Sequence, residues 1–430
     1  ERVLLPVEIV HADDTSADEH TLREHDRAQA IPLDRSPAAR ATIVRRAGHG
    51  DTVLFTYHLA LLDGWSRARF LTEFLDRLRD REQSAVRTPR PARPGFAEAA
   101  SLLEARDHRQ DLAFWRSVLG GMAGPTLLGR PAALDALVPA AAEGLPRKII
   151  RCLDTPETAD LLAAGRAHGV TLTALATVAM ALSLHRATGE SDVMFGLSVS
   201  GRDLLEVPGV DEVVGVLLNT VPVRVEVDAW RPVREMLRSV SDDRAAAMPH
   251  DGADLGEIHR ELGVTALFDS LVVIQNFLDP EAARETRDRH GILTEEAEDS
   301  THFALTWVFT PGDEMTLKVE YRAELVDETT ATRLADHAMA VLRALSRTAQ
   351  APDTPLAALP VASDPAVSGP NPAAVAAANR PWSSTVMDEF AVAVRREPES
   401  VALVCGAVRW SLGELVDRVM RMAGRLAEAS

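Results

Sequence analysis

A single histidine stands five residues before an Asp-Gly pair, in a segment whose residue types could carry acid–base chemistry. The segment TYHLALLDGWS covers residues 56–66. His58 could act as a general base, as a structural hydrogen-bonding group or as a buried core histidine. Asp63 could cap the helix that follows or pair with a buried arginine, and Gly64 could supply a backbone conformation that a Cβ would forbid. Taken alone, these residue types favour structural roles for His58 and Asp63.

Side-chain alternation makes a further prediction about this segment. If residues 51–62 form one strand, His58 and Leu59 point to opposite faces, because successive side chains of a strand alternate. His58 would then point away from the space that Leu59 faces, unless the turn is rewound.

Two later polar residues follow or begin predicted strands. Arg202 comes after the strand in SDVMFGLSVSGR and is either a buried partner for a carboxylate or a solvated turn residue. Asn219 lies between apolar neighbours in NTVPVR, so its amide must be hydrogen-bonded and is either a site residue or a backbone staple. His250 and His302 are expected to be surface residues.

Composition excludes several classes of function. The chain has 430 residues and a net charge of −18, which suggests two to three domains and argues against nucleic acid or an anionic membrane as partner. No run of about 18 apolar residues predicts a membrane span. Two distant cysteines, Cys152 and Cys405, exclude a disulfide framework and a thiolate zinc site, so no metal site and a cytoplasmic location are expected. Because the chain starts at Glu1 without a visible leader, we expect a fragment or a processed chain.

The hydrophobic pattern predicts mixed α and β structure. Helical spacing covers residues 63–78, 98–121, 156–169, 171–189, 230–248 and 329–348, with Thr171 as an N-cap. Strands are predicted over residues 2–10, 51–62, 147–154, 191–202, 214–227, 268–278, 302–312 and 315–326. A proline-rich linker follows over 361–382, and then a helix, a hairpin turning at Gly406 and a last helix that a Ser411–Glu414 capping box begins. The predicted fold class is α+β with mixed sheets in two lobes, followed by a truncated second domain.

The ordered motifs resemble the condensation domain of a nonribosomal peptide synthetase, running into the start of an adenylation domain. The segments that carry the resemblance are YHLALLDGWS, LAFWRSVLGG, SDVMFGLSVSGRD, VGVLLNTVPVRV, ALFDSLVVIQNF and VALVCGAVRWSLGELVDR. The resemblance implies a partial N-terminal lobe over 1–125, a C-terminal lobe over 146–360, the linker over 361–382 and a truncated adenylation domain over 383–430. It also implies a chloramphenicol acetyltransferase-like V of two lobes around a tunnel, with the N-terminal lobe incomplete.

The family motif His-His-x-x-x-Asp-Gly, matched back from Asp63 and Gly64, places its first histidine on His58 and its second on Leu59. The resemblance gives the catalytic role to that second histidine, which this chain lacks. Carried over by position, His58, Asp63 and Gly64 form the catalytic turn. Trp65, Ser66 and Asn219 lie along the tunnel, and Arg202 supports Asp63.

The resemblance also implies partners and cofactors. Upstream and downstream carrier domains would present thioesters on phosphopantetheine, an adenylation domain would follow in cis, and this chain would bind no cofactor itself. Three functions remain open: amide formation that is impaired or proceeds by positioning, a non-catalytic domain that docks carriers or recruits a tailoring enzyme, and acyl transfer to a free amine or alcohol.

Overall fold

The computed structural model describes residues 4–11, 16–34, 36–46, 50–82, 94–129, 146–275, 280–293 and 301–359, with shorter stretches between 394 and 418. The chain divides into two units, residues 1–371 and 372–430. The predicted linker over 361–382 lies outside the described residues, as does most of the helix predicted over 384–400.

A three-stranded mixed sheet forms the first part of the larger unit. Strands β1 (Val7–His11) and β2 (Ala39–Arg45) are parallel, and β3 (Thr52–Tyr57) is antiparallel to β2. Helix α1 (Ser16–Ala28) is joined to this sheet through Asp26, which accepts hydrogen bonds from Arg40 and Thr56. Helix α2 (Gly64–Glu82) stacks Phe70 on Phe55 of β3, with ring centroids 4.9 Å apart. The sequence patterns missed α1 and β2.

A six-stranded mixed sheet forms the second part. Its strands run in the order β4-β9-β8-β7-β5-β6, with parallel pairing where β7 meets β5 and β8. The mixed α+β class is therefore confirmed. The strands are β4 (Arg147–Leu153), β5 (Asp192–Val199), β6 (Asn219–Glu226), β7 (Ser270–Ile274), β8 (Leu305–Thr310) and β9 (Met315–Tyr321).

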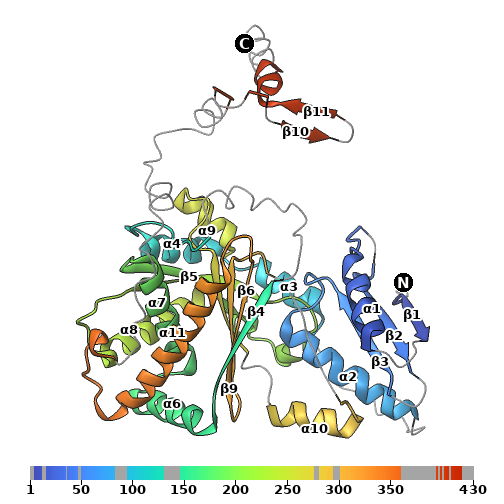
Figure 1. Cartoon of the computed structure of the whole chain (residues 1–430), viewed down its shortest axis with the longest axis horizontal. Helices are drawn as coiled ribbons and strands as arrows, with labels where there is room; N and C mark the ends of the chain where they lie inside the picture. The colour runs from blue at the N-terminus through green and yellow to red at the C-terminus, as the bar shows by residue number, and fades with distance from the viewer. Residues whose placement is uncertain are drawn as a thin grey trace. The chain divides into compact units, whose positions relative to one another are not determined.

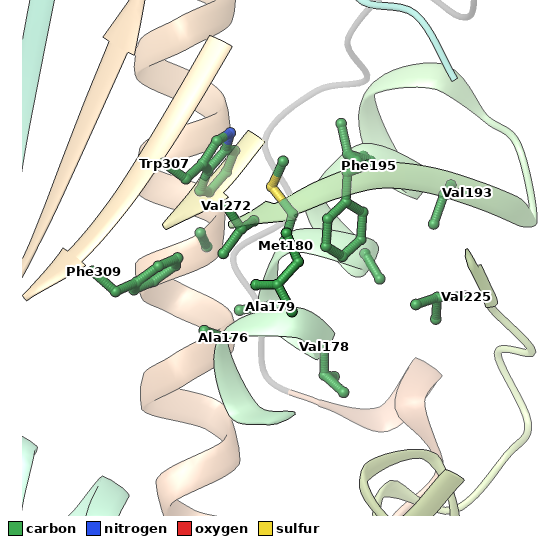
Figure 2. Close-up of a cluster of buried hydrophobic side chains, with 14 of the residues drawn as sticks. Ala176, Val178, Ala179, Met180, Val193, Phe195, Val225, Val272, Trp307 and Phe309 are labelled. Carbon is green, nitrogen blue, oxygen red and sulfur yellow. The ribbon is translucent and has the colours of Figure 1, made fainter. Parts of the chain in front are cut away.

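Four helices gather on one side of this sheet, and the three-stranded sheet with α1 and α2 lies on the other (Figure 1). These helices are α6 (Thr155–His168), α7 (Leu172–Thr188), α8 (Val233–Ala247) and α11 (Glu328–Ser346). Thr171 caps α7 as predicted, accepting from the amide of Ala174. Figure 2 shows the core between the helices and the six-stranded sheet, where Met180 of α7 lies near Phe195 of β5 and Trp307 of β8. Burial of such side chains stabilises the fold by about 1.5–3 kcal/mol each.

The helix predicted over 98–121 is in fact two helices. Helix α3 (Phe96–Glu104) ends before Asp107, whose carboxylate accepts from the amide of Arg109 and begins α4 (His108–Leu119). Trp115 and Leu119 of α4 join the core of the six-stranded sheet, although they fall within the range predicted for the first lobe. The break therefore lets the two helices pack against different neighbours.

Further short helices lie between the strands of the second sheet or follow α11. They are α9 (Leu255–Leu262), α10 (Pro280–His290) and the 3-10 turns η1 (Arg202–Leu204), η2 (Val210–Glu212), η3 (Met248–His250), η4 (Arg347–Gln350) and η5 (Leu356–Ala358). None of these was predicted from the sequence.

The second unit contains the predicted hairpin. Strands β10 (Val401–Cys405) and β11 (Val408–Ser411) pair antiparallel. The Ser411–Glu414 capping box is confirmed, because each residue's amide donates to the other's side chain. In the described part of the chain no single helix is long and apolar enough to cross a membrane; α6 and α7 reach that limit only as a pair bent by 101°.

Candidate active site

The His58 segment is a turn, not the continuation of a strand. Strand β3 ends at Tyr57, and the amide of Leu61 donates to the carbonyl of His58 at 2.9 Å. This hydrogen bond closes a β-turn with Leu59 at its first corner and 45% exposed. The prediction that His58 and Leu59 alternate along a strand is therefore wrong.

The imidazole of His58 is engaged within the same turn. Its Nδ1 accepts from the amide of Ala60 at 3.0 Å, so the neutral ring carries its proton on Nε2. In this arrangement Nδ1 cannot take a proton from a substrate without losing the hydrogen bond from Ala60. The remaining Nε2–H is a hydrogen-bond donor.

Asp63 and Arg202 form a buried ion pair. The side chains are 1% and 2% exposed, and Arg202 donates to both carboxylate oxygens, at 2.8 and 3.3 Å. The amides of Ser66 and Leu217 also donate to Asp63, at 2.8 and 3.1 Å. Asp63 thus caps α2 and holds Arg202 at once, so both roles left open by the sequence are present in one residue.

The environment of Asp63 favours its ionised form. Burial alone would raise the pKa of this carboxyl, but hydrogen bonds from Arg202 and Ser66 and the guanidinium charge outweigh burial and lower the pKa below its usual value. The carboxylate is therefore a fixed negative charge that holds the turn, and it is already committed to its donors.

Ser66 and Trp65 tie α2 to the segment that follows β5. The Ser66 hydroxyl donates to the carbonyl of Gly215 at 2.7 Å and accepts from Arg202, and the residue is fully buried. Trp65 donates through Nε1 to the carbonyl of Asp211 at 2.8 Å, and Arg202 lies 5.6 Å from its ring centroid. Both residues occupy bracing positions here.

The backbone conformation that a Cβ would forbid was predicted at Gly64, but the structure has it at Gly201. Gly64 begins α2 and is not among the glycines with positive φ. Gly201 has a φ of +66°, and a Cβ there would lie 2.0 Å from the carbonyl oxygen of Leu217. The sequence signal was present, since Gly201 directly precedes Arg202, but the close approach of Leu217 comes from the fold.

Asn219 staples a second loop to the start of β6. Its Nδ2 donates to the carbonyls of Asp251 and Ala253, at 2.7 and 2.8 Å, and its Oδ1 accepts from the amide of Thr220. The amide is thus fully used by the backbone, which is the staple alternative that the sequence left open.

Beside the loop that Asn219 holds, His250 pairs with a carboxylate of α4, which the sequence patterns missed. His250 Nδ1 lies 2.8 Å from Asp111, which is buried, and Phe114 stacks on the imidazole at 4.2 Å. Trp115 donates to the carbonyl of His250. The expectation that His250 is a plain surface residue is therefore wrong.

The described residues at the turn offer little acid–base chemistry. Asp63 is committed to its donors, His58 Nδ1 is occupied, and the residue at the motif's second position is aliphatic. The arrangement can hold a shaped turn and present one imidazole N–H. No described group of three or more His, Cys, Asp or Glu side chains is placed to bind a metal ion.

Comparison with known sequences gives the family. A family model described as "Condensation domain" matches residues 3–365. The chain belongs to the condensation domain family. It is a condensation domain of the nonribosomal peptide synthetase type, and such domains act on substrates carried by phosphopantetheinylated carrier domains. The match ends at residue 365, so the adenylation domain predicted from residue 383 stays a prediction.

The condensation domain is similar to parts of much longer synthetases. It is 26% identical over 413 residues to surfactin synthase subunit 3 of Bacillus subtilis, spanning 94% of this chain and 31% of that protein. It is also 26% identical over 306 residues to bacitracin synthase 3 of Bacillus licheniformis, spanning 70% of this chain and 5% of that protein. The chain therefore spans less than a third of the length of either relative.

Solved structures share the fold. The first condensation domain of the CDA synthetase matches with a TM-score of 0.64 at 19% identity, over 84% of this chain and 78% of that one. The X-domain from teicoplanin biosynthesis, solved as a complex with OxyB, matches with a TM-score of 0.64 at 18% identity, over 83% and 80%. At these identities the likeness supports the fold of the condensation domain.

Proposed function

We propose that this domain joins a donor acyl or peptidyl thioester to an acceptor aminoacyl thioester, the two being presented by upstream and downstream carrier domains. In this proposal the domain catalyses by positioning and not by proton transfer. The buried Asp63–Arg202 pair carries the proposal, because it keeps the turn in shape although Leu59 replaces the expected base.

Positioning alone is chemically sufficient for a slow reaction. A thioester is already activated, and orientation of two reactants can contribute about 7–11 kcal/mol. A positioned general base typically adds a further factor of about 10² to 10⁴, which Leu59 cannot supply. Only the neutral amine can attack, so the rate should rise with pH as the acceptor amine loses its proton.

The test restores the missing base. Donor and acceptor carrier domains are loaded with aminoacyl groups, and amide formation is followed by mass spectrometry of the intact carriers. Leu59→His should raise the rate by about 10²-fold or more. Leu61→His is the matched control, since Leu61 lies in the same turn and is 37% exposed, and it should leave the rate unchanged.

A second candidate function is non-catalytic recruitment of a tailoring enzyme. The observation that favours it is the exposed aliphatic corner of the turn, Leu59, in a fold shared with the X-domain that was solved with OxyB. Carrier binding without product, and no product after Leu59→His, would support this candidate and contradict the first. Product formed only with a free amine or alcohol would instead indicate an acyltransferase with an untethered acceptor.

A further inference from the structure

A pocket separate from the motif turn opens between α4 and α8. It has a volume of about 350 Å³ and contains none of the turn residues, Asp63, Arg202 or Asn219 in its lining. We call it the α4–α8 pocket. Its volume lies at the lower end of the range for small-molecule sites.

The inner walls of the α4–α8 pocket are apolar. Strand β6, an edge strand of the six-stranded sheet, contributes Val221, Val223 and Val225. Trp115 of α4 and Met236 of α8 line it as well, and both are almost completely buried. Phe114, Val118 and Val223 also line the pocket and are only partly buried, so a ligand that covers them and displaces their water must have an apolar body.

Two of the three arginines at the pocket are already neutralised. Arg224 makes a two-bond contact with Asp192, at 2.8 and 2.9 Å, and also donates to the carbonyl of Val118. Arg244 makes a two-bond contact with Asp251. These arginines shape the walls but offer no net charge to a ligand.

The charges around the pocket leave one net negative charge. Glu226 accepts from Arg224 at 3.4 Å, and the four carboxylates, Asp192, Asp251, Glu226 and Asp243, face the three arginines. Glu226 and Asp243 line the pocket together with Arg231, and Asp242 lies beside Asp243. The pKa of the Asp243 carboxyl is raised, and burial is the largest cause. The charges of Asp242 and Glu226 raise it further, whereas a hydrogen bond from Ser239 and the charge of Arg231 lower it. A cation bound at Asp243 would relieve this repulsion.

From the apolar walls and the acidic mouth, we propose that the α4–α8 pocket binds a small organic ammonium ion with an apolar body. The body lies against Val118 and Val223, and the ammonium donates to Asp243 beside the Ser239 hydroxyl. The proposal is independent of whether the motif turn is catalytic, because the pocket shares no residue with it.

The test measures the binding of three probes to the whole chain by ligand-detected NMR titration. The probes share a phenylethyl body and differ in the charge of the head group. The probes are 2-phenylethylamine, 2-phenylethanol and 3-phenylpropionate. The amine should bind with a dissociation constant of about 1 mM or below, tighter than the alcohol and the carboxylate. Equal affinity of the amine and the alcohol, or tightest binding of the carboxylate, would overturn the proposal.

Variants locate the site and separate charge from shape. Asp243→Asn should weaken amine binding by about two- to five-fold and leave the alcohol unchanged, since an ion pair at a partly exposed mouth contributes modestly. Asp242→Asn, which alters a neighbouring carboxylate outside the lining, should change affinity less than about two-fold. Ala246→Trp, at the exposed rim, should block all three probes. The affinity for the amine should also fall as the pH is lowered through the Asp243 pKa, because protonation removes the negative charge. Unchanged amine binding in Asp243→Asn or Ala246→Trp would contradict the proposal that the amine binds in the α4–α8 pocket.

Discussion

At the scale of single residues, the turn combines an exposed aliphatic corner with a buried ion pair. Leu59 stands at an exposed corner, whereas Asp63 and Arg202 are fully buried and joined by two hydrogen bonds. Their interaction does not depend on which side chain occupies position 59. The scaffold of the turn and its chemistry are therefore separable.

The buried pair makes a clear stability prediction. Arg202→Met should destabilise the domain by about 3–5 kcal/mol, because it leaves the Asp63 carboxylate buried without its counter-charge. Adding Asp63→Asn should recover part of this loss, which a double-mutant cycle from urea unfolding would measure. The exposed pair Arg147–Glu328 is the control, and Arg147→Met should cost less than about 0.5 kcal/mol. A loss below about 1 kcal/mol for Arg202→Met would contradict a structural role for the pair.

At the scale of elements, the close approach of η1 to the segment before β6 depends on one glycine. Gly201→Ala would place a Cβ 2.0 Å from the carbonyl oxygen of Leu217, on a backbone with a φ of +66°. That peptide segment cannot move freely, because the Leu217 amide donates to Asp63. The substitution should therefore disturb the support of the turn as well as the local backbone.

Gly263→Ala supplies the matched comparison. Gly263 ends α9 with a φ of +67°, and a Cβ added there would have no other atom within 4 Å. The substitution should cost only the left-handed backbone penalty of about 1–2 kcal/mol. Gly201→Ala should cost clearly more in urea unfolding, and equal costs for the two substitutions would show that the Leu217 contact relaxes without penalty.

At the scale of the whole molecule, the half-buried His337 of α11 and the buried Asp269 beside β7 give stability opposing dependences on pH. Burial, with the charges of Arg186 and His185, lowers the pKa of His337 to about 4. The unfolded chain then binds more protons below about pH 6.5, so this residue's contribution to stability is lost as pH falls from 6.5 toward 4. Burial raises the pKa of Asp269 to about 6, although the amides of Gly129 and Leu128 lower it. Its folded form binds more protons, so stability is lost as pH rises from about 4 to 6.

Single substitutions should reveal the two opposite dependences of folding stability on pH. In Asp269→Asn the stability should rise with pH between about 4 and 6 more steeply than in the parent chain, because the Asp269 contribution that opposes His337 is removed. In His337→Gln the stability should instead fall with pH over that range. Each effect is on the order of 2 kcal/mol, with the His337 value reduced by its partial exposure. Unfolding free energies measured at several pH values check both signs, and parallel curves for the three proteins would contradict the assignment.

The sequence by itself determined the features that depend on near neighbours. The N-cap at Thr171, the capping box at Ser411 and Glu414, and most strands of the six-stranded sheet follow from residues within about four positions of one another. The ordered motifs also sufficed to indicate the family, whereas the absence of the family's second histidine at Leu59 stays a prediction. Local hydrogen bonds and side-chain periodicity are sufficient for these features, because the groups that interact are adjacent in the chain.

Only the tertiary structure decided which distant groups meet. Asp63 and Arg202 are 139 residues apart, as are Asp111 and His250, and no local pattern specifies either distance. The sequence also could not show that β3 stops at Tyr57, since the apolar run continues to Leu62 while the backbone folds into a turn. A polar side chain can form a buried ion pair, hydrogen-bond to a distant backbone or line a pocket. Which of these it does depends on how separate elements pack, and a single run of residues does not specify that packing.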